Sequence, residues 1–241
     1  MNVHFLSSKE EKLKNMFDHI ANKYDLINRI LSFGIDFIWR KKAIYLLDKF
    51  SKRKVQKILD LATGTGDVAI LLAKKFKYAN ITGLDPSDKM LKIAQKKIKN
   101  NFLEKRIQTL LGYSQNIPLQ DETFDIVTIA FGIRNFQYIY DSIQEIYRIL
   151  KPSGLLGILE FSIPSNYWIK KIYYFYFRFI EKIGNYISKN DFAYDYLIKS
   201  ILSFPYYNKK MNHLLKCYKF DTIHMQKFTF GIVSFYLFKK K

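Results

Sequence analysis

Residues 60–67, DLATGTGD, decide the fold of this chain. They follow an apolar run at 57–61, KILDL, and precede a helical pattern in which Ala69 and Leu72 share a face. Glycines let the backbone turn tightly and let a ligand touch the main chain. The exposed amide groups at the start of the helix favour an anionic group. The segment therefore predicts a ligand-binding loop between a strand and a helix of an α/β sheet.

The glycine spacing of this loop fits two classes of adenosine cofactor. Gly64-x-Gly66-x-x-Ala69 matches the dinucleotide fingerprint, so the loop alone does not separate NAD from S-adenosylmethionine. Asp85 ends the next strand, where a carboxylate accepts hydrogen bonds from ribose hydroxyls in either class. An ordinary strand–helix turn without a ligand is the remaining alternative, and the presence of Asp85 argues against it.

Three features favour S-adenosylmethionine over NAD. Asp60 begins the loop, where it would attract the amino group of S-adenosylmethionine and repel a pyrophosphate. The expected sheet has one parallel half followed by a hairpin, which suits a methyltransferase. An NAD-binding sheet has two mononucleotide-binding halves instead. The turn at 148–154, RILKPSG, also looks like a recurrent element of class I methyltransferases.

Residues 55–162 alternate between strand and helix patterns. The strand signals are KILDL, NITGL, IQTLL, FDIVTIAF and LLGILEF, and the helix before the last of them is expected to end at KPSG, residues 151–154. Such alternation predicts a parallel sheet with right-handed crossovers and helices on both faces.

Two further regions flank this alternating core, and together the three form one expected domain. Residues 1–54 read as an N-terminal helical cap with a turn at Ser32-Phe33-Gly34. Residues 163–241 add an aromatic helix and two strand-like runs, KFDTIHM and FTFGIVSFYLF, of which the second alternates at period two. A short gap between these runs predicts a terminal β-hairpin and hence an antiparallel edge on the sheet.

Composition excludes several classes of protein. A hydrophobic content of 49% over 241 residues is enough for a sizeable core and excludes global disorder. A single cysteine, Cys217, excludes an internal disulfide framework and CxxC metal clusters. The chain has no apolar N-terminal signal and no apolar run long enough to span a bilayer, so a cytoplasmic protein is expected.

The net charge of +19 is open to three interpretations. It is compatible with a nucleic-acid partner, with an anionic membrane surface, or with an A/T-rich coding sequence that favours Lys, Ile, Asn, Tyr and Phe. The helix expected at 167–187 bears on the second interpretation, because Lys171, Arg178 and Lys182 form one polar stripe among aromatic residues. Such a helix could lie at a membrane interface, cap a pocket, or simply pack in the core.

Segments along nearly the whole chain resemble one family. They are MFDHIANKYDLINRILSFGIDFIWR, LDLATGTGD, GLDPSDKML, FDIVTIAFGIRNF, RILKPSGLLGILEFSIP and FTFGIVSFY. Together they are similar to the ubiquinone/menaquinone biosynthesis C-methyltransferases (the UbiE/MenG family), and AFGIRNF and FTFGIVSFY are closer to the menaquinone-pathway members. The resemblance implies a class I S-adenosylmethionine-dependent methyltransferase fold, Rossmann-like, with a mostly parallel sheet, an antiparallel C-terminal hairpin strand and N-terminal helices.

The resemblance also implies a reaction and its partners. A methyl group would pass from S-adenosylmethionine to a ring carbon of a polyprenylated hydroquinone, with demethylmenaquinol expected first and the benzoquinol precursor of ubiquinone as the alternative. No metal and no nucleic-acid partner are expected, and contact with an anionic membrane at the inner face of the cytoplasmic membrane is possible. The oligomeric state is not predicted.

Carried over to this sequence, the resemblance implies a cofactor site. Gly64, Thr65 and Gly66 would line the methionine half, and Asp85 would hold the ribose. Tyr113 and Ser114 stand where the family usually has Asn-Ala or Asp-Ala beside the adenine, and a hydroxyl at this position could still bond the adenine.

The acceptor side is expected at the carboxyl end of the fourth strand, where ligands bind in open α/β sheets. Arg134 would stabilise a developing phenolate, Asn135 would hold a quinol oxygen, and Phe131 would line the pocket. A solvent-facing arginine that caps the next loop is the alternative. Four further residues are weaker candidates: Tyr24 and Asn28 on one helix face, His19 as a base, and Glu160 as a pocket residue or a strand-end charge.

Two other functions are weighed against this hypothesis. An amino-group nucleic-acid methylase would need an Asn/Asp-Pro-Pro-aromatic stretch after the fourth strand, where this chain has Phe131-Gly132-Ile133-Arg134. A cytosine C5 methylase needs a pocket cysteine, and Cys217 lies near the last strands. A non-catalytic binding module is disfavoured by the intact glycine loop and Asp85.

Overall fold

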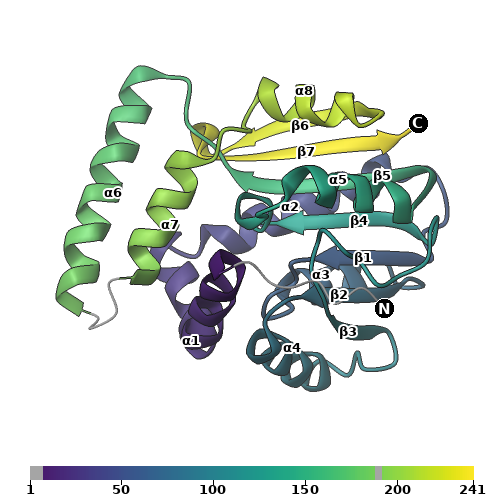
Figure 1. Ribbon diagram of the computed structural model, residues 1–241. Coiled ribbons are helices and arrows are strands. Elements are labelled where there is room, and N and C mark those ends of the chain that lie inside the picture. The colour runs from purple at the N-terminus through teal and green to yellow at the C-terminus, as the bar shows by residue number, and fades with distance from the viewer. Residues whose placement is uncertain (1–7, 188–191) are drawn as a thin grey trace.

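A seven-stranded sheet with the order β3-β2-β1-β4-β5-β7-β6 forms the centre of the molecule (Figure 1). The computed structural model describes residues 8–187 and 192–241, and the side chains outside 179–195. Strand β7 is antiparallel to both of its neighbours, β5 and β6, whereas the strands from β3 to β5 are parallel. The strands are β1 Lys57–Leu61, β2 Asn80–Asp85, β3 Ile107–Leu111, β4 Phe124–Ala130, β5 Leu150–Phe161, β6 Phe220–Phe228 and β7 Val233–Lys240. The expected class I methyltransferase fold, mostly parallel with an antiparallel hairpin strand, is confirmed.

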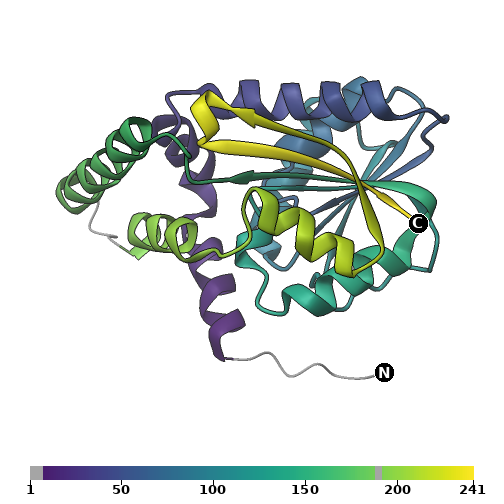
Figure 2. The same ribbon diagram turned by 90° about the horizontal axis from the view of Figure 1, so that it is seen from above.

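Helices cover both faces of the sheet and bury two hydrophobic cores (Figure 2). One core packs against α2 Ile35–Phe50, α3 Asp67–Lys75 and α4 Asp88–Asn100. The other packs against α5 Ile139–Ile149 and α8 Lys209–Cys217. Because both faces are covered, β1 and β4 are buried almost throughout, as their continuous apolar runs predict.

The two boundaries expected near the C-terminal strands differ from the structure. Helix α5 already ends at Ile149, and KPSG lies within β5, because Leu150 pairs with Phe124 ahead of a register shift. The hairpin turn falls at Thr229–Gly231, which the alternation had assigned to the last strand. Thr229, Phe230 and Gly231 all have positive φ there, which ends the extended conformation that strand pairing needs.

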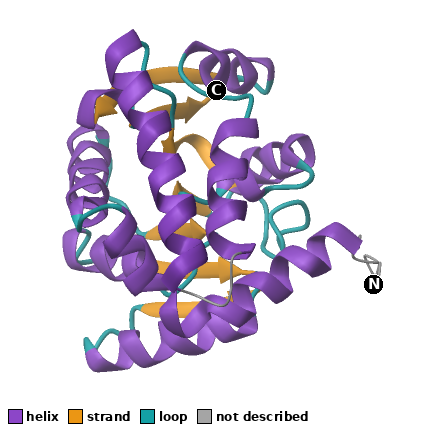
Figure 3. Ribbon diagram, turned by 90° about the vertical axis from the view of Figure 1, so that its left-hand side faces the viewer, coloured by secondary structure: helices purple, strands orange, loops and turns teal. Residues whose placement is uncertain are grey.

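Three helices gather at the carboxyl end of the parallel strands. Figure 3 looks onto this end, which α6 Tyr167–Ile187 and α7 Phe192–Ser203 cover. The long N-terminal helix α1 Ser8–Leu31 passes beside them. The hydroxyl of Tyr176 on α6 donates a hydrogen bond to the carbonyl of Leu31, and this bond connects α6 to the end of α1. No described helix is both long and apolar enough to cross a bilayer.

Candidate active site

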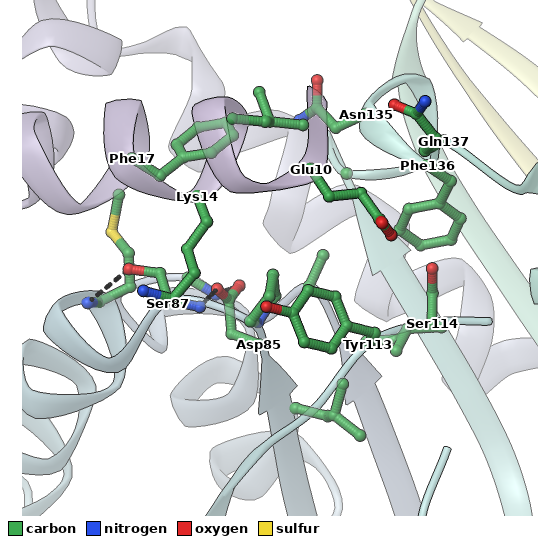
Figure 4. Close-up of a pocket in the computed structure, with 18 of the residues that line it drawn as sticks. Glu10, Lys14, Phe17, Asp85, Ser87, Tyr113, Ser114, Asn135, Phe136 and Gln137 are labelled. Carbon is green, nitrogen blue, oxygen red and sulfur yellow. Dashed lines mark hydrogen bonds between the residues drawn. The ribbon is translucent and has the colours of Figure 1, made fainter. Parts of the chain in front are cut away.

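A first cavity, of about 110 Å³, lies where β1, β2 and β4 end beneath helix α1. Figure 4 shows Glu10 and Lys14 extending from α1 across this cavity toward Asp85 at the end of β2 and Tyr113 in the loop after β3. Gly64 of the glycine loop and Ser114 also line it. The cavity is therefore built from the loop that the sequence singled out and from a helical lid.

The glycine loop needs its glycines for backbone conformation and for close packing. Gly64 and Gly66 have φ values of 57° and 84°, the left-handed region that favours glycine. A Cβ at Gly66 would lie 3.0 Å from the Cβ of Ala94 on α4, so this glycine lets the loop pack on that helix. A Cβ at Gly64 would meet nothing within 4 Å, and Gly64 lines the cavity, so its main chain is open to a ligand.

Asp85 joins the glycine loop to the end of β2. One carboxylate oxygen accepts a hydrogen bond from the amide of Gly64 at 2.9 Å, and the other accepts one from the amide of Ser87 at 2.9 Å. Burial raises the pKa of Asp85 to about 6, although both amide donors lower it. Asp85 lines the cavity and keeps lone pairs for further donors.

Asp60 and Thr65 belong to the glycine loop but do not line the cavity. The Asp60 carboxylate accepts hydrogen bonds from the hydroxyls of Thr63 and Thr128, and burial raises its pKa to about 6. The Thr65 hydroxyl donates to Asp25 of α1 at 2.6 Å and accepts from Lys97 of α4 at 3.0 Å. Their contacts therefore hold the loop and the helical cap in place, and Asp60 and Thr65 contribute to ligand binding only indirectly.

Ser114 and Tyr113 both line the cavity, as expected for the pair beside an adenine. The Ser114 hydroxyl is 2.8 Å from that of Ser142, which itself donates to the carbonyl of Tyr138. Because Ser142 uses its one proton on Tyr138, Ser114 donates to Ser142 and retains free lone pairs. Ser114 can thus accept a hydrogen bond from an amino group such as that of adenine.

A second cavity, of about 440 Å³, adjoins the first between α1, α2, α6 and α7. Tyr24 and Phe131 line both cavities, and Asn28 lines the second. Its remaining walls are mostly aliphatic and aromatic side chains, among them Trp39, Phe161, Ile172, Phe177, Ile198 and Ile201. Two adjoining compartments, one partly polar and one apolar, meet at Tyr24 and Phe131.

Arg134 is a buried cation at the wall of the apolar cavity. Its side chain is 5% exposed and pairs with Glu160, which is 1% exposed, at an N–O distance of 2.8 Å. The guanidinium also donates to the carbonyl of Phe131 and to the hydroxyl of Ser200. The alternative of a solvent-facing arginine is therefore wrong, and Glu160 is the ion-pair partner of Arg134.

The other predicted site residues divide between the two cavities and the surface. Asn135 lines the first cavity, and its amide oxygen accepts a hydrogen bond from Tyr196 of α7 at 2.9 Å. His19 is exposed on α1 and lines neither cavity. Sequence reasoning missed Glu10, Lys14 and Phe17 of α1, which also line the first cavity.

The chain resembles known proteins over nearly its full length. Residues 5–240 match the model of the ubiE/COQ5 methyltransferase family. The chain belongs to this family. It is 37% identical over 229 residues to demethylmenaquinone methyltransferase of Bacteroides fragilis, covering 95% of this chain and 92% of the relative. It is 45% identical over 191 residues to demethylmenaquinone methyltransferase of Thermotoga maritima, covering 78% and 80%.

A third similar protein is named for both ubiquinone and menaquinone biosynthesis. The Ubiquinone/menaquinone biosynthesis C-methyltransferase UbiE of Geotalea daltonii is 43% identical over 202 residues, covering 83% of this chain and 84% of the relative. Among solved structures, a SAM-dependent methyltransferase from Aquifex aeolicus superposes with a TM-score of 0.61 at 16% identity, covering 82% of this chain and 88% of that one. This low identity supports the fold alone.

The family establishes this protein as a methyltransferase with S-adenosylmethionine as methyl donor. When bound, that donor supplies an electrophilic methyl group. The first cavity fits it, because it offers the open main chain of Gly64, the carboxylate of Asp85 and the acceptor hydroxyl of Ser114. Within the described residues, no group of three or more His, Cys, Asp or Glu side chains could hold a metal ion.

We expect S-adenosylmethionine binding to this methyltransferase to weaken below pH 6. Asp85 has a pKa of about 6 in the free protein, and hydrogen bonds from ribose hydroxyls favour its ionised form. Protons therefore compete with the donor, and the affinity should fall about tenfold between pH 7 and pH 5. Calorimetry across this range measures the effect.

The matched variant is Asp85→Asn, which keeps the volume and removes the titrating group. Its donor affinity should be weaker by about 1.5–3 kcal/mol at pH 7.5, the scale of hydrogen bonds to a charged group, and independent of pH. The same pH dependence in Asp85→Asn would assign the titration to another group and contradict this role of Asp85.

Proposed function

We propose that this methyltransferase transfers the methyl group of S-adenosylmethionine to a ring carbon of a polyprenylated hydroquinone, and that demethylmenaquinol is its acceptor. One observation carries the proposal: the donor cavity adjoins a larger apolar cavity at Tyr24 and Phe131. An apolar cavity of about 440 Å³ suits an aromatic ring and the start of a prenyl tail. The names of the relatives from Bacteroides fragilis and Thermotoga maritima support the same acceptor.

Arg134 provides the electrostatic part of the proposed mechanism. A ring carbon becomes nucleophilic as the neighbouring hydroxyl loses its proton and negative charge develops on that oxygen, and a fixed cation beside the oxygen stabilises the charge. The carbon then bonds to the methyl group while the methyl–sulfur bond breaks and S-adenosylhomocysteine leaves. Loss of the hydrogen on the methylated carbon as a proton, with protonation of the oxygen, restores the aromatic hydroquinone. Glu160 and the Phe131 carbonyl hold the guanidinium in one orientation. Among the described residues, no hydrogen bond uses Nη2 of Arg134, so this nitrogen is available to a ligand oxygen.

Tyr24 and Phe131 complete the proposed acceptor site, and Asn135 approaches the acceptor from the first cavity. Tyr24 and Phe131 lie at the boundary of the two cavities, where they can align the acceptor ring with the methyl group. The Asn135 amide keeps its NH₂ group as a donor for a quinol oxygen, because its bond with Tyr196 occupies only the amide oxygen. The walls also exclude water from the charged intermediate.

The choice of acceptor is tested by direct competition. The purified protein is offered labelled S-adenosylmethionine with reduced demethylmenaquinol, a demethylated benzoquinol analogue and tRNA. We expect label in the naphthoquinol and much less in the benzoquinol. Preferential labelling of the benzoquinol would favour the acceptor suggested by the relative named UbiE, and label in tRNA alone would overturn the proposal.

We also propose that the protein docks on an anionic membrane surface at the inner face of the cytoplasmic membrane. Helix α6 leaves Trp168, Ile172 and Phe175 on one stripe, with Trp168 68% and Phe175 71% exposed. Lys171 and Arg178 border this stripe, while the opposite side of the helix buries Tyr173 and Phe177. An exposed apolar stripe edged by cations is typical of an interfacial helix.

The same stripe continues to the opening of the apolar cavity. Ile172 lines that cavity and is exposed, as are Phe33 of the α1–α2 turn and Phe230 of the turn before β7. A prenylated acceptor is confined to the bilayer, so an opening surrounded by exposed apolar side chains gives it a path that avoids water.

Vesicle sedimentation tests the docking proposal. We expect the protein to pellet with anionic vesicles at low salt and to be released as salt rises. The double variant Trp168→Ser/Phe175→Ser should bind at least tenfold more weakly, since each buried aromatic contributes about 1.5–3 kcal/mol. The control is Tyr78→Ser/Phe102→Ser, two even more exposed aromatics that lie before β2 and β3 at the other end of the strands. Equal vesicle binding by the two double variants would contradict docking through α6.

A further inference from the structure

Tyr173 of α6 carries a buried hydroxyl without a partner. Its side chain is 4% exposed, and its Oη forms no hydrogen bond with any residue that the structure describes. Buried polar groups in folded proteins are nearly always paired, so such an atom needs an explanation. Tyr173 also lines the apolar cavity, which is the proposed acceptor site.

Neighbouring tyrosines show that this arrangement is specific to Tyr173. Tyr176 lies one turn along α6 and lines the same cavity, but its hydroxyl donates to the Leu31 carbonyl. Tyr196 of α7 donates to the amide oxygen of Asn135. Two other buried polar atoms lack partners in the described chain, Asn208 Oδ1 and Asn212 Oδ1, and neither residue lines a cavity at this end of the sheet.

We propose that the Tyr173 hydroxyl donates a hydrogen bond to a ring oxygen of the acceptor and thereby aligns the neighbouring ring carbon with the methyl donor. This inference rests on the proposed function, because it takes the hydroquinone as the ligand of the apolar cavity. A prenyl tail has no polar atom, so only hydrogen bonds to the oxygens of the hydroquinone ring can set the orientation of that ring. Arg134 and Tyr173 then supply two donors from different elements, the turn after β4 and helix α6.

The raised pKa of Tyr173 makes its hydroxyl a hydrogen-bond donor and not a base. Burial raises the pKa of Tyr173 well above its ordinary value, with opposing influences from Arg134 and Glu160. The phenol therefore keeps its proton at neutral pH and positions the acceptor without taking a proton from it. Its ring packs on Phe177 at a centroid distance of 4.3 Å, which restricts the orientation of the phenol.

Tyr173→Phe tests the proposal, because it removes only the hydroxyl. We expect the acceptor KM to rise about five- to tenfold, the effect of one neutral hydrogen bond, with an unchanged Kd for S-adenosylmethionine. The melting temperature without ligand should stay the same or increase, because the variant removes an unpaired buried polar group.

Tyr176→Phe is the matched comparison for stability. It removes the bond to Leu31, so its melting temperature should fall, whereas that of Tyr173→Phe should not. An unchanged acceptor KM in folded Tyr173→Phe, or a clear loss of stability in that variant, would overturn the role of Tyr173. If the wild-type protein methylates no hydroquinone, the proposed function fails instead, and the inference fails with it.

Discussion

Arg134→Ala is expected to lower turnover by about 10²–10³, the range seen when one preorganised donor is removed from a developing oxyanion. Arg134 acts on charge that exists only as the methyl group moves, so the affinity for S-adenosylmethionine should stay within about threefold. Arg134→Lys should lose nearly as much turnover, because an ammonium lacks the planar fork that reaches Glu160 and a ligand together. Steady-state kinetics and calorimetry on each variant measure both quantities.

The ion pair with Glu160 makes stability the essential control for this prediction. Removing Arg134 alone leaves a carboxylate that is 1% exposed without its partner, which costs about 3–5 kcal/mol. The double variant Arg134→Ala/Glu160→Gln removes the orphaned charge and should recover much of this stability, but not turnover. Near-wild-type turnover in either folded variant would mean that Arg134 does not stabilise the transition state.

Gly132→Ala is expected to reduce turnover about 10²-fold and to weaken donor binding. A Cβ at Gly132 would lie 2.6 Å from the Cβ of Ala62, so the added methyl must push the two segments apart. Ala62 belongs to the glycine loop and Gly132 precedes Arg134, so this one contact joins the donor side to the acceptor side. A displacement on the order of 1 Å at such a junction can cost about 10²-fold in rate.

Gly157→Ala is the matched control for overpacking. A Cβ there would meet Leu47 of α2 at 3.4 Å and Phe235 of the neighbouring strand β7 at 3.5 Å, which are ordinary contacts. We expect Gly157→Ala to retain turnover within a few fold, whereas Gly132→Ala also loses about 1–3 kcal/mol of stability. Equal kinetics for the two variants would show that the close approach of Ala62 and Gly132 is not needed for the reaction.

The sequence predicted the fold well because local signals agreed with one another. The continuous apolar runs, the glycine loop after the first strand and the acid after the second all reflect backbone requirements within a few residues. The predicted boundary of the C-terminal hairpin was wrong because the sequence pattern there disagrees with the backbone conformation. The residues at 228–231 alternate like a strand, but three positive φ values at Thr229, Phe230 and Gly231 make them a turn.

The site was less predictable, because its contacts join distant segments. The pairing of Arg134 with Glu160 links the ends of two different strands, and Thr65 bonds to Asp25 of the N-terminal helix. Neither partner follows from spacing along the chain. The unpaired hydroxyl of Tyr173 has no sequence signal at all, since α6 contains many tyrosines and only packing decides which of them remains without a partner.

A structure of the protein with S-adenosylhomocysteine and reduced menaquinol tests the central claim most directly, namely that the two adjoining cavities are the donor and acceptor sites of one reaction. We predict the adenosine portion beside Asp85 and Ser114, and the quinol ring at the boundary formed by Tyr24 and Phe131. A ring oxygen should lie within hydrogen-bond distance of Arg134. A quinol bound elsewhere, or an apolar cavity that stays closed to it while the protein remains active, would contradict the account.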